Sequence, residues 1–122
     1  MMTPNLFLLY VADPARSMQF YQRLLGRPPA ANFPTYVAFA FGEGFYLGLW
    51  STSARDFVSL GSGHRSEIAF MVENEAAVDA LYQDWRNSGV VIEQEPKLAV
   101  FGRTFVALDP DGHRLRVCIP DR

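Results

Sequence analysis

The first half of the chain alternates short apolar runs with one amphipathic stretch. The run Leu6–Val11 is short and bounded by turn residues, which favours a β-strand over a helix. Further along, Met18, Tyr21 and Leu25 recur at i, i+3 and i+7, the spacing of one helical stripe. Residue types that favour helix ends bracket this stripe: Asp13 as N-cap, Pro14 at the first helical position and Gly26 as a left-handed stop. The pattern predicts a strand followed by a helix.

Three more strand-like segments follow this helix, at about residues 29–33, 35–41 and 44–51. The last two are separated by Gly42-Glu43-Gly44, a composition typical of a tight hairpin turn. The first half therefore predicts the element order βαβββ.

The second half repeats this order. At an offset of half the chain length, Phe7–Val11 aligns with Ile68–Val72, which predicts a strand over about 67–72. Val78, Leu81 and Trp85 form the second helical stripe. Asn74 is its expected cap and Gly89 its expected end. Strands are expected at about 90–95, 100–108 and 113–119, and the turn before the last of them is Asp109-Pro110-Asp111-Gly112.

A single domain over residues 1–122 follows from the repeat. It consists of two βαβββ repeats, about 1–53 and 64–122, joined by residues 54–63. The joining stretch from Ser51 to Gly63 is polar and contains Gly and Ser. Such a connection favours a mobile lip over a site.

Composition and charge exclude several classes of protein. The chain has 49% hydrophobic and 20% charged residues, which is typical of a globular domain. Its net charge of −2 and the lack of a basic block exclude non-specific nucleic-acid binding. The single cysteine, Cys118, excludes a disulfide framework. No apolar run approaches the roughly 20 residues of a membrane span, and no secretory pattern is visible, so we expect a soluble cytoplasmic protein.

A duplicated βαβββ module resembles the vicinal oxygen chelate superfamily, which includes glyoxalase I, extradiol dioxygenases and the fosfomycin and bleomycin resistance proteins. The stretches that carry the resemblance are Val11–Tyr21, Phe101–Phe105 and Asp109–His113. A closer likeness is to the phenazine antibiotic resistance proteins of this superfamily, through Thr3–Leu6, Tyr36–Phe39, Ser66–Ile68, Phe101–Phe105 and Arg116–Cys118. The resemblance implies an α+β fold in which two βαβββ modules form curled mixed sheets around a cavity.

The resemblance also implies where a metal would bind. In the enzymes of the superfamily, the first and last strands of each half supply His, Gln and Glu ligands to a divalent metal. These positions fall on Leu6, Gly48, Glu67 and Arg116. Only Glu67 has a ligand atom, whereas a catalytic metal site normally needs about three protein ligands. We therefore expect no metal, no other cofactor and no catalytic residue.

The two histidines leave an alternative open. His64 and Glu67 form an H-x-x-E pattern, and His113 follows the turn glycine Gly112. Exposed loop and turn positions are the simpler interpretation of both histidines. An unusual arrangement of His64, Glu67 and His113 would instead indicate a metal-dependent lyase, isomerase or dioxygenase of the same fold.

Alternation along the strands assigns residues to the two faces of each sheet. If Leu6 and Gly48 face the cavity, so do Leu8, Tyr10, Tyr46 and Trp50 in the first half. In the second half, Met71, Arg114 and Cys118 are expected to lie on the same face as Glu67 and Arg116. The other register, which includes Phe7, Leu9, Leu47, Leu49, Leu115 and Val117, is uniformly apolar and is expected to face the helices.

The expected cavity residues suit recognition of a flat ring. The resemblance implies that Trp50 stacks on the ligand, and Gly48 is expected to leave room beside it. Arg116 can bind a carboxylate or phenolate of the ligand, and Glu67 can accept a hydrogen bond from it. Alternatively, Glu67 and Arg116 pair with each other, and Trp50 belongs to a core or a dimer interface. Tyr10, Tyr46 and Met71 serve as ligand contacts or as packing.

The sequence thus predicts a metal-independent binding protein for a small planar aromatic antibiotic, phenazine- or bleomycin-like. It would sequester the compound or chaperone it to export. The superfamily often pairs two chains, so a homodimer is expected. The alternatives are the metal-dependent enzyme and a non-catalytic interaction domain without a small ligand.

Overall fold

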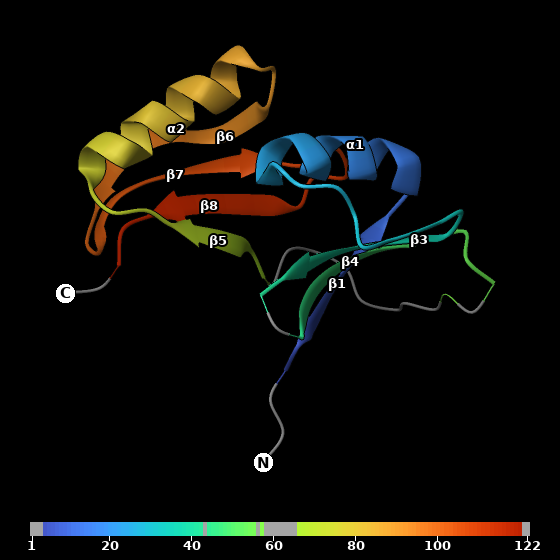
Figure 1. The fold of residues 1–122 in the computed structure, drawn as a ribbon. Helices are drawn as coiled ribbons and strands as arrows, with labels where there is room; N and C mark the ends of the chain where they lie inside the picture. The colour runs from blue at the N-terminus through green and yellow to red at the C-terminus, as the bar shows by residue number, and fades with distance from the viewer. Residues whose placement is uncertain (1–3, 43, 56, 58–65, 121–122) are drawn as a thin grey trace. The chain divides into compact units, whose positions relative to one another are not determined.

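The computed structural model describes residues 4–42, 44–55, 57 and 66–120. The chain divides into two compact units, Met1–Gly61 and Ser62–Arg122, which we call unit 1 and unit 2. Unit 1 contains β1 (Leu6–Val11), α1 (Pro14–Leu25), β2 (Ala31–Phe33), β3 (Tyr36–Phe41) and β4 (Phe45–Ser51). Unit 2 contains β5 (Ile68–Met71), α2 (Glu75–Asn87), β6 (Val91–Ala99), β7 (Gly102–Leu108) and β8 (Arg114–Cys118) (Figure 1).

The two units share one topology, as the repeat in the sequence predicts. The sheet of unit 1 has the order β1-β4-β3-β2, and that of unit 2 has the order β5-β8-β7-β6. In both sheets the first strand pairs in parallel with the last, whereas the other pairs are antiparallel. The α+β fold of two βαβββ modules, each with a mixed sheet, is therefore confirmed.

The helices begin and end where their capping residues predict. The Asp13 side chain accepts hydrogen bonds from the backbone N–H groups of Ala15 and Arg16, and so satisfies donors that the first helical turn leaves free. Gly26 closes α1 in the left-handed region at φ 67°, where a glycine avoids the penalty of a Cβ atom. Asn74 caps α2 by accepting from Ala77 N. The C-cap of α2 is Ser88, one residue before the predicted Gly89.

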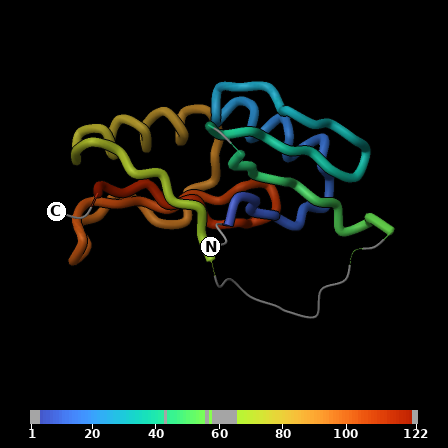
Figure 2. The backbone as a smooth tube through the Cα atoms, turned by 60° about the horizontal axis from the view of Figure 1, so that its bottom comes forward, coloured from blue at the N-terminus to red at the C-terminus, as the bar shows by residue number. Residues whose placement is uncertain are grey.

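Each unit buries the sheet face that its own helix covers. In unit 1, α1 packs on β3 and β4, and in unit 2, α2 packs on β6 and β7 (Figures 1 and 2). The predicted helix-facing register is buried, with Leu49, Leu115 and Val117 fully inaccessible. On the edge strand β1, Leu9 is half-buried and Phe7 is exposed. Phe7 is 54% exposed and contacts Phe45 edge to face at 5.3 Å.

The predicted end of β6 in unit 2 differs from the structure. Strand β6 continues to Ala99, well beyond the predicted end near residue 95. Pro96 argues against a strand because it lacks an N–H donor, but β6 is an edge strand and tolerates it. The register of β6 against β7 shifts around Gln94, which absorbs the irregularity. The turn between β7 and β8 forms as predicted, with Gly112 N donating to Asp109 O at 2.9 Å.

The predicted lip from Ser51 to Gly63 lies largely outside the described residues. Its beginning is ordered by short-range hydrogen bonds, since the Ser51 hydroxyl accepts from Ser53 N at 3.0 Å. Phe57 N donates to Ala54 O at 3.0 Å. Within the described part of the chain, no helix has the length and hydrophobicity that a membrane span requires.

Candidate functional site

The strands of unit 1 present an aromatic face on the side of the sheet opposite α1. Its position follows from register, because Tyr10 pairs with Trp50 on one side of β4 and Tyr36 pairs with Trp50 on the other. We define the aromatic face as the nine residues of β1, β3 and β4 that share this side: Leu6, Leu8, Tyr10, Tyr36, Ala38, Ala40, Tyr46, Gly48 and Trp50. Each of Leu6, Leu8, Tyr10 and Tyr46 is at least 40% exposed. None of the nine is charged, so the face suits an apolar ring.

Three rings form a cluster at one end of this face. The ring centroid of Phe57 lies 4.9 Å from that of Tyr10 and 5.2 Å from that of Trp50. The Tyr10 and Trp50 rings are 6.4 Å apart, at an angle of 65°. The Tyr10–Trp50 and Tyr10–Phe57 pairs are edge to face, a favourable arrangement of aromatic side chains. The sequence alone could not place Phe57, because it follows the strand and obeys no strand alternation.

Gly48 does not leave the room beside Trp50 that we predicted. A Cβ atom at this position would meet Leu8 Cδ2 and Tyr36 Oη at 2.7 Å each, and Tyr36 Cε1 at 2.9 Å. The space above the glycine is therefore filled by its two neighbouring strands, and chiefly by the phenol of Tyr36. Tyr36 was not among the predicted site residues, because its approach to Gly48 depends on the register of β3 against β4.

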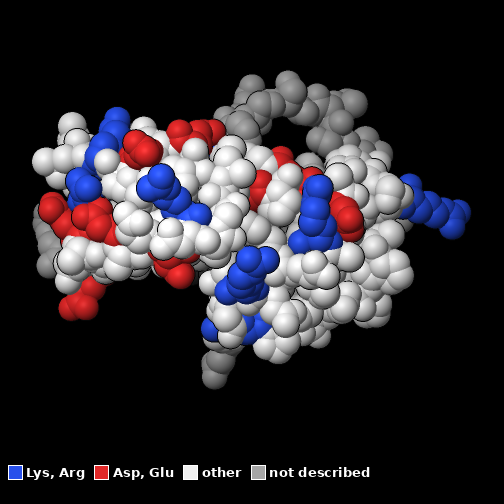
Figure 3. Space-filling model, turned by 90° about the horizontal axis from the view of Figure 1, so that it is seen from above, with Lys and Arg blue, Asp and Glu red and all other residues white. Residues whose placement is uncertain are grey.

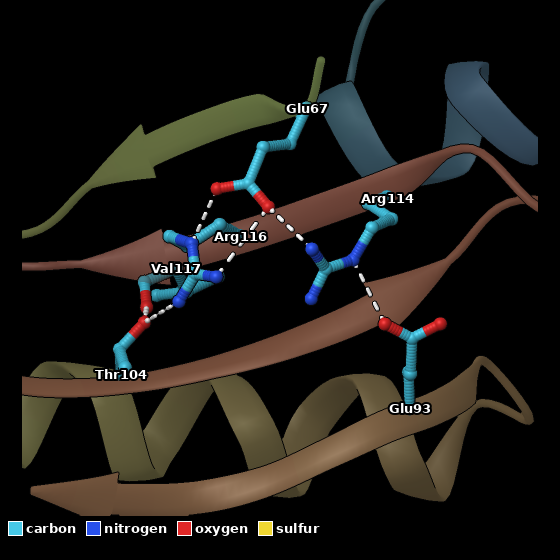
Figure 4. Close-up of polar contacts among 6 residues, drawn as sticks. All are labelled: Glu67, Glu93, Thr104, Arg114, Arg116 and Val117. Carbon is cyan, nitrogen blue, oxygen red and sulfur yellow. Dashed lines mark hydrogen bonds and ion pairs between the residues drawn. The ribbon is translucent and has the colours of Figure 1, made fainter. Parts of the chain in front are cut away.

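Unit 2 carries a charged cluster around β8, in which Glu67, the residue before β5, lies between two arginines (Figure 4). Arg116 Nε donates to Glu67 Oε1 at 2.5 Å, and Arg114 Nη1 lies 3.1 Å from Glu67 Oε2. Arg114 also pairs with Glu93, at 2.8 Å between Nε and Oε1. The hydrogen bond from Arg116 lowers the pKa of Glu67 below its usual range, and the positive charges of both arginines add to this against the effect of burial. Glu67 is therefore ionised at neutral pH.

Arg116 is held by more than Glu67. Its Nη1 donates to Thr104 Oγ1 at 3.1 Å, and that buried hydroxyl donates in turn to Val117 O at 2.7 Å (Figure 4). The guanidinium lies over the ring of Phe101, with its carbon 5.7 Å from the ring centroid. The pairing of Glu67 with Arg116, which the sequence left open, is therefore present. This pairing uses N–H donors of Arg116 that we had assigned to a ligand. A guanidinium has five N–H donors, so others are left for a ligand.

The remaining predicted residue of unit 2, Met71, ends β5 and is 69% exposed. It is a neighbour of Cys118 in the parallel pairing of β5 with β8. Its exposure leaves it available for an apolar contact.

The residues at the family's metal positions do not fit a divalent cation. Leu6 and Gly48 offer no donor atom, and Arg116 brings a positive charge. Both carboxylate oxygens of Glu67 are bound by arginines. Across the described residues, no three His, Cys, Asp or Glu side chains are grouped as a metal would need.

Of the two histidines, His64 lies outside the described residues. His113 is not the exposed turn residue that we expected, since its side chain is only 25% exposed and its Nδ1 lies 2.7 Å from Asp109 Oδ2. Burial lowers the pKa of His113, but the hydrogen bond and charge of Asp109, together with the charge of Asp111, raise it overall. Asp109 also accepts from the backbone of Asp111 and His113. The pair therefore holds the turn before β8.

A shallow cleft in unit 2 lies apart from the predicted site residues. Arg103 and Asp79 form an ion pair on its wall, at 2.7 Å. It is lined by Asp79, Tyr82, Gln83, Glu95, Pro96 and Arg103. On the face of the molecule in Figure 3, acidic and basic side chains are interspersed, which agrees with the absence of a basic block in the sequence.

The fold and the site residues place the chain in a known class. The chain belongs to the Glyoxalase/Bleomycin resistance protein/Dioxygenase superfamily, whose family model matches residues 3–117. This confirms the superfamily that the sequence motifs indicated.

Among individual proteins, the chain is similar to the phenazine antibiotic resistance protein EhpR of Enterobacter agglomerans. The two are 36% identical over 119 residues, which cover 95% of this chain and 91% of EhpR. It is also 31% identical to the glutathione transferase FosA of Serratia marcescens, over 93% of this chain and 77% of FosA. The solution structure of protein ATC0852 from Agrobacterium tumefaciens superimposes with a TM-score of 0.84, at 44% identity and 98% coverage of both chains.

Proposed function

We propose that this protein binds a small planar aromatic antibiotic, phenazine- or bleomycin-like, without a metal, and confers resistance by sequestering it. The observation that carries the proposal is the aromatic face of unit 1, which is uncharged and includes large exposed apolar side chains beside Trp50. Monomeric proteins rarely leave a large apolar patch uncovered unless it binds something. The similarity to EhpR, a phenazine resistance protein, supports the class of ligand.

Trp50 is the proposed stacking surface for the ligand. The indole offers the largest flat area of the face, and Tyr10 and Phe57 hold it through ring contacts. Stacking of two aromatic rings contributes about 0.5–1.5 kcal/mol beyond the burial of their area. Leu8 and Tyr46, which are exposed on the same face, would then cover the rest of an apolar ring system.

The charged cluster of unit 2 is proposed, by itself, as a binding position for a carboxylate or phenolate group. Arg116 retains N–H donors beyond those that Glu67 and Thr104 accept. Its guanidinium is held in place by these partners, so little side-chain entropy would be lost when it donates to a carboxylate or phenolate. Met71 would supply an apolar contact from the end of β5.

The chemistry of the residues at the family's ligand positions supports the proposed metal independence. One ionised carboxylate that already balances two arginines is a poor substitute for about three free donors. The chain is also similar to FosA, which is a glutathione transferase. An experiment must therefore distinguish binding of the ligand from enzymatic activity.

Isothermal titration calorimetry with a phenazine monocarboxylate, in the presence of EDTA, tests the proposal. We expect saturable binding to the wild type and a loss of at least tenfold in affinity for Trp50→Ala, since stacking and burial are lost together. Phe7→Ala is the matched control, because it removes an exposed aromatic ring from the same unit in the register opposite to the aromatic face. Equal affinities of Trp50→Ala and the wild type would contradict the proposal, as would binding that requires a divalent metal.

We also propose that the protein acts as a homodimer. Strand β1 pairs only with β4 among the described strands, and Leu6 at its start is 44% exposed. Apolar side chains on an edge strand favour contact with another chain. Light scattering coupled to size-exclusion chromatography should give a mass near twice 13.7 kDa, and a mass near 13.7 kDa would exclude the dimer.

A further inference from the structure

The phenol of Tyr36 covers the backbone of a glycine at the centre of the aromatic face. In the antiparallel pairing of β3 with β4, Tyr36 lies opposite Trp50 and Ala38 lies opposite Gly48. The Tyr36 ring therefore extends diagonally, and its Oη lies 2.7 Å from where a Cβ atom of residue 48 would be. Gly48 is buried under this ring and under Leu8. An aromatic residue that covers a strand glycine protects its exposed backbone.

Covering the glycine explains the ring of Tyr36 but not its hydroxyl. A phenylalanine would cover Gly48 equally well and would add no polar atom to an apolar surface. Within the described residues, the Tyr36 hydroxyl has no hydrogen-bond partner. Tyr36 is half-buried, and its hydroxyl is not among the fully buried polar atoms, so this O–H is available as a donor to a ligand on the face.

The hydroxyl lies within reach of a ring stacked on Trp50. Gly48 and Trp50 are two residues apart on β4, which separates them by about 7 Å along the strand. Three fused rings are longer than this distance, so the edge of a ligand that stacks on Trp50 and extends along β4 can reach the hydroxyl. Because the aromatic face carries no charged side chain, its polar recognition depends on the tyrosine hydroxyls and the indole N–H. Of the three tyrosines, Tyr10 and Tyr46 are more exposed, and Tyr36 lies nearest the centre of the face.

We propose that Tyr36 is a specificity-determining residue whose hydroxyl donates a hydrogen bond to an acceptor in the plane of the bound ring. The ligand class is then a fused heteroaromatic compound with a ring nitrogen or an edge oxygen, rather than a fused hydrocarbon. This inference rests on the proposed function, because it concerns the ligand that stacks on Trp50.

The test compares two ligands of the same shape and charge. A phenazine monocarboxylate has ring nitrogens, and the anthracene monocarboxylate substituted at the same position has none. We expect the wild type to bind the phenazine about tenfold more tightly, which corresponds to one hydrogen bond. Tyr36→Phe keeps the ring over Gly48 and removes only the hydroxyl. It should lower the affinity for the phenazine by about tenfold and leave the affinity for the anthracene unchanged.

Tyr82→Phe is the control, because it makes the same chemical change in unit 2, where the hydroxyl donates to Glu95 at 3.3 Å. It should leave both affinities unchanged. If Tyr36→Phe changes neither affinity, or lowers both equally, the inference is overturned while the proposed function stands. If the wild type binds neither ligand, the inference and the proposed function are both overturned. Circular dichroism of each variant verifies that it is folded.

Discussion

Substitution of Gly48 by alanine tests how tightly the centre of the aromatic face is packed. The new Cβ atom would lie 2.7 Å from Leu8 Cδ2 and 2.7 Å from Tyr36 Oη, whereas carbon atoms in favourable contact are about 3.5–4.0 Å apart. Leu8 is 44% exposed and its methyl group can turn toward solvent. The ring of Tyr36 is rigid, and its Cε1 at 2.9 Å must move as well. The strain therefore falls mainly on Tyr36.

The expected magnitude combines two opposing effects. Overpacking of a well-packed site costs about 1–3 kcal/mol. Alanine offsets about 0.5–1 kcal/mol of this because it loses less backbone entropy on folding than glycine does, and Gly48 does not have a positive φ that would strain an alanine. Gly48→Ala should therefore lower the free energy of unfolding by roughly 1 kcal/mol.

A double-mutant cycle in urea identifies the cause. In a Tyr36→Ala background the clash with the ring is gone, so Gly48→Ala should become neutral or stabilising. The coupling energy should then equal the overpacking cost, about 1–3 kcal/mol. Tyr36→Phe keeps Cε1 in place and should relieve only part of the cost. If Gly48→Ala costs the same in all three backgrounds, the packing of Tyr36 over Gly48 is refuted.

Three further predictions concern unit 2. Thr104→Val should lower the free energy of unfolding in urea by about 1–3 kcal/mol, because Val117 O loses its buried donor, and Thr104→Ser should restore most of this stability. The pKa of Glu67 is lowered in the folded state, so its contribution is present above about pH 4 and is lost on further acidification. The stability difference between the wild type and Glu67→Gln should therefore shrink as the pH falls below 4, and a pH-independent difference would contradict this. The pKa of His113 is raised, so its contribution is present below about pH 6.5 and is lost as the pH rises through the folded-state pKa. An NMR titration should find this histidine titrating above 6.5 in the wild type and lower in Asp109→Asn.

Local signals in the sequence were sufficient for the elements and their faces. Asp13 and Asn74 cap the helices by short-range hydrogen bonds, which depend only on neighbouring residues. Alternation assigned the buried register of β4 and β8, because side chains of a strand alternate whatever its partners are. The predicted end of β6 was wrong. Pro96 is unfavourable in a central strand, and the sequence does not say which strand is at the edge.

The contacts of the candidate site were harder to predict from the sequence, because they depend on the pairing between strands. Tyr36 reaches Gly48 only in the observed register of β3 against β4, and a shift by one residue would turn it to the other face. Phe57 lies beyond β4, so no periodicity relates it to Trp50. Thr104 was overlooked because a buried threonine in an apolar strand looks like any β-branched residue.

Tryptophan fluorescence of a Trp85→Phe variant tests the central claim most directly. The chain has two tryptophans, and Trp85 is 4% exposed among the rings of Phe70 and Phe105, so phenylalanine can replace it and leave Trp50 as the sole emitter. We predict that a phenazine monocarboxylate quenches this emission saturably at micromolar concentration in the presence of EDTA, after correction for absorption by the ligand. Quenching that appears only after a divalent metal is added would contradict metal-free binding at Trp50 and would indicate a metal-dependent enzyme.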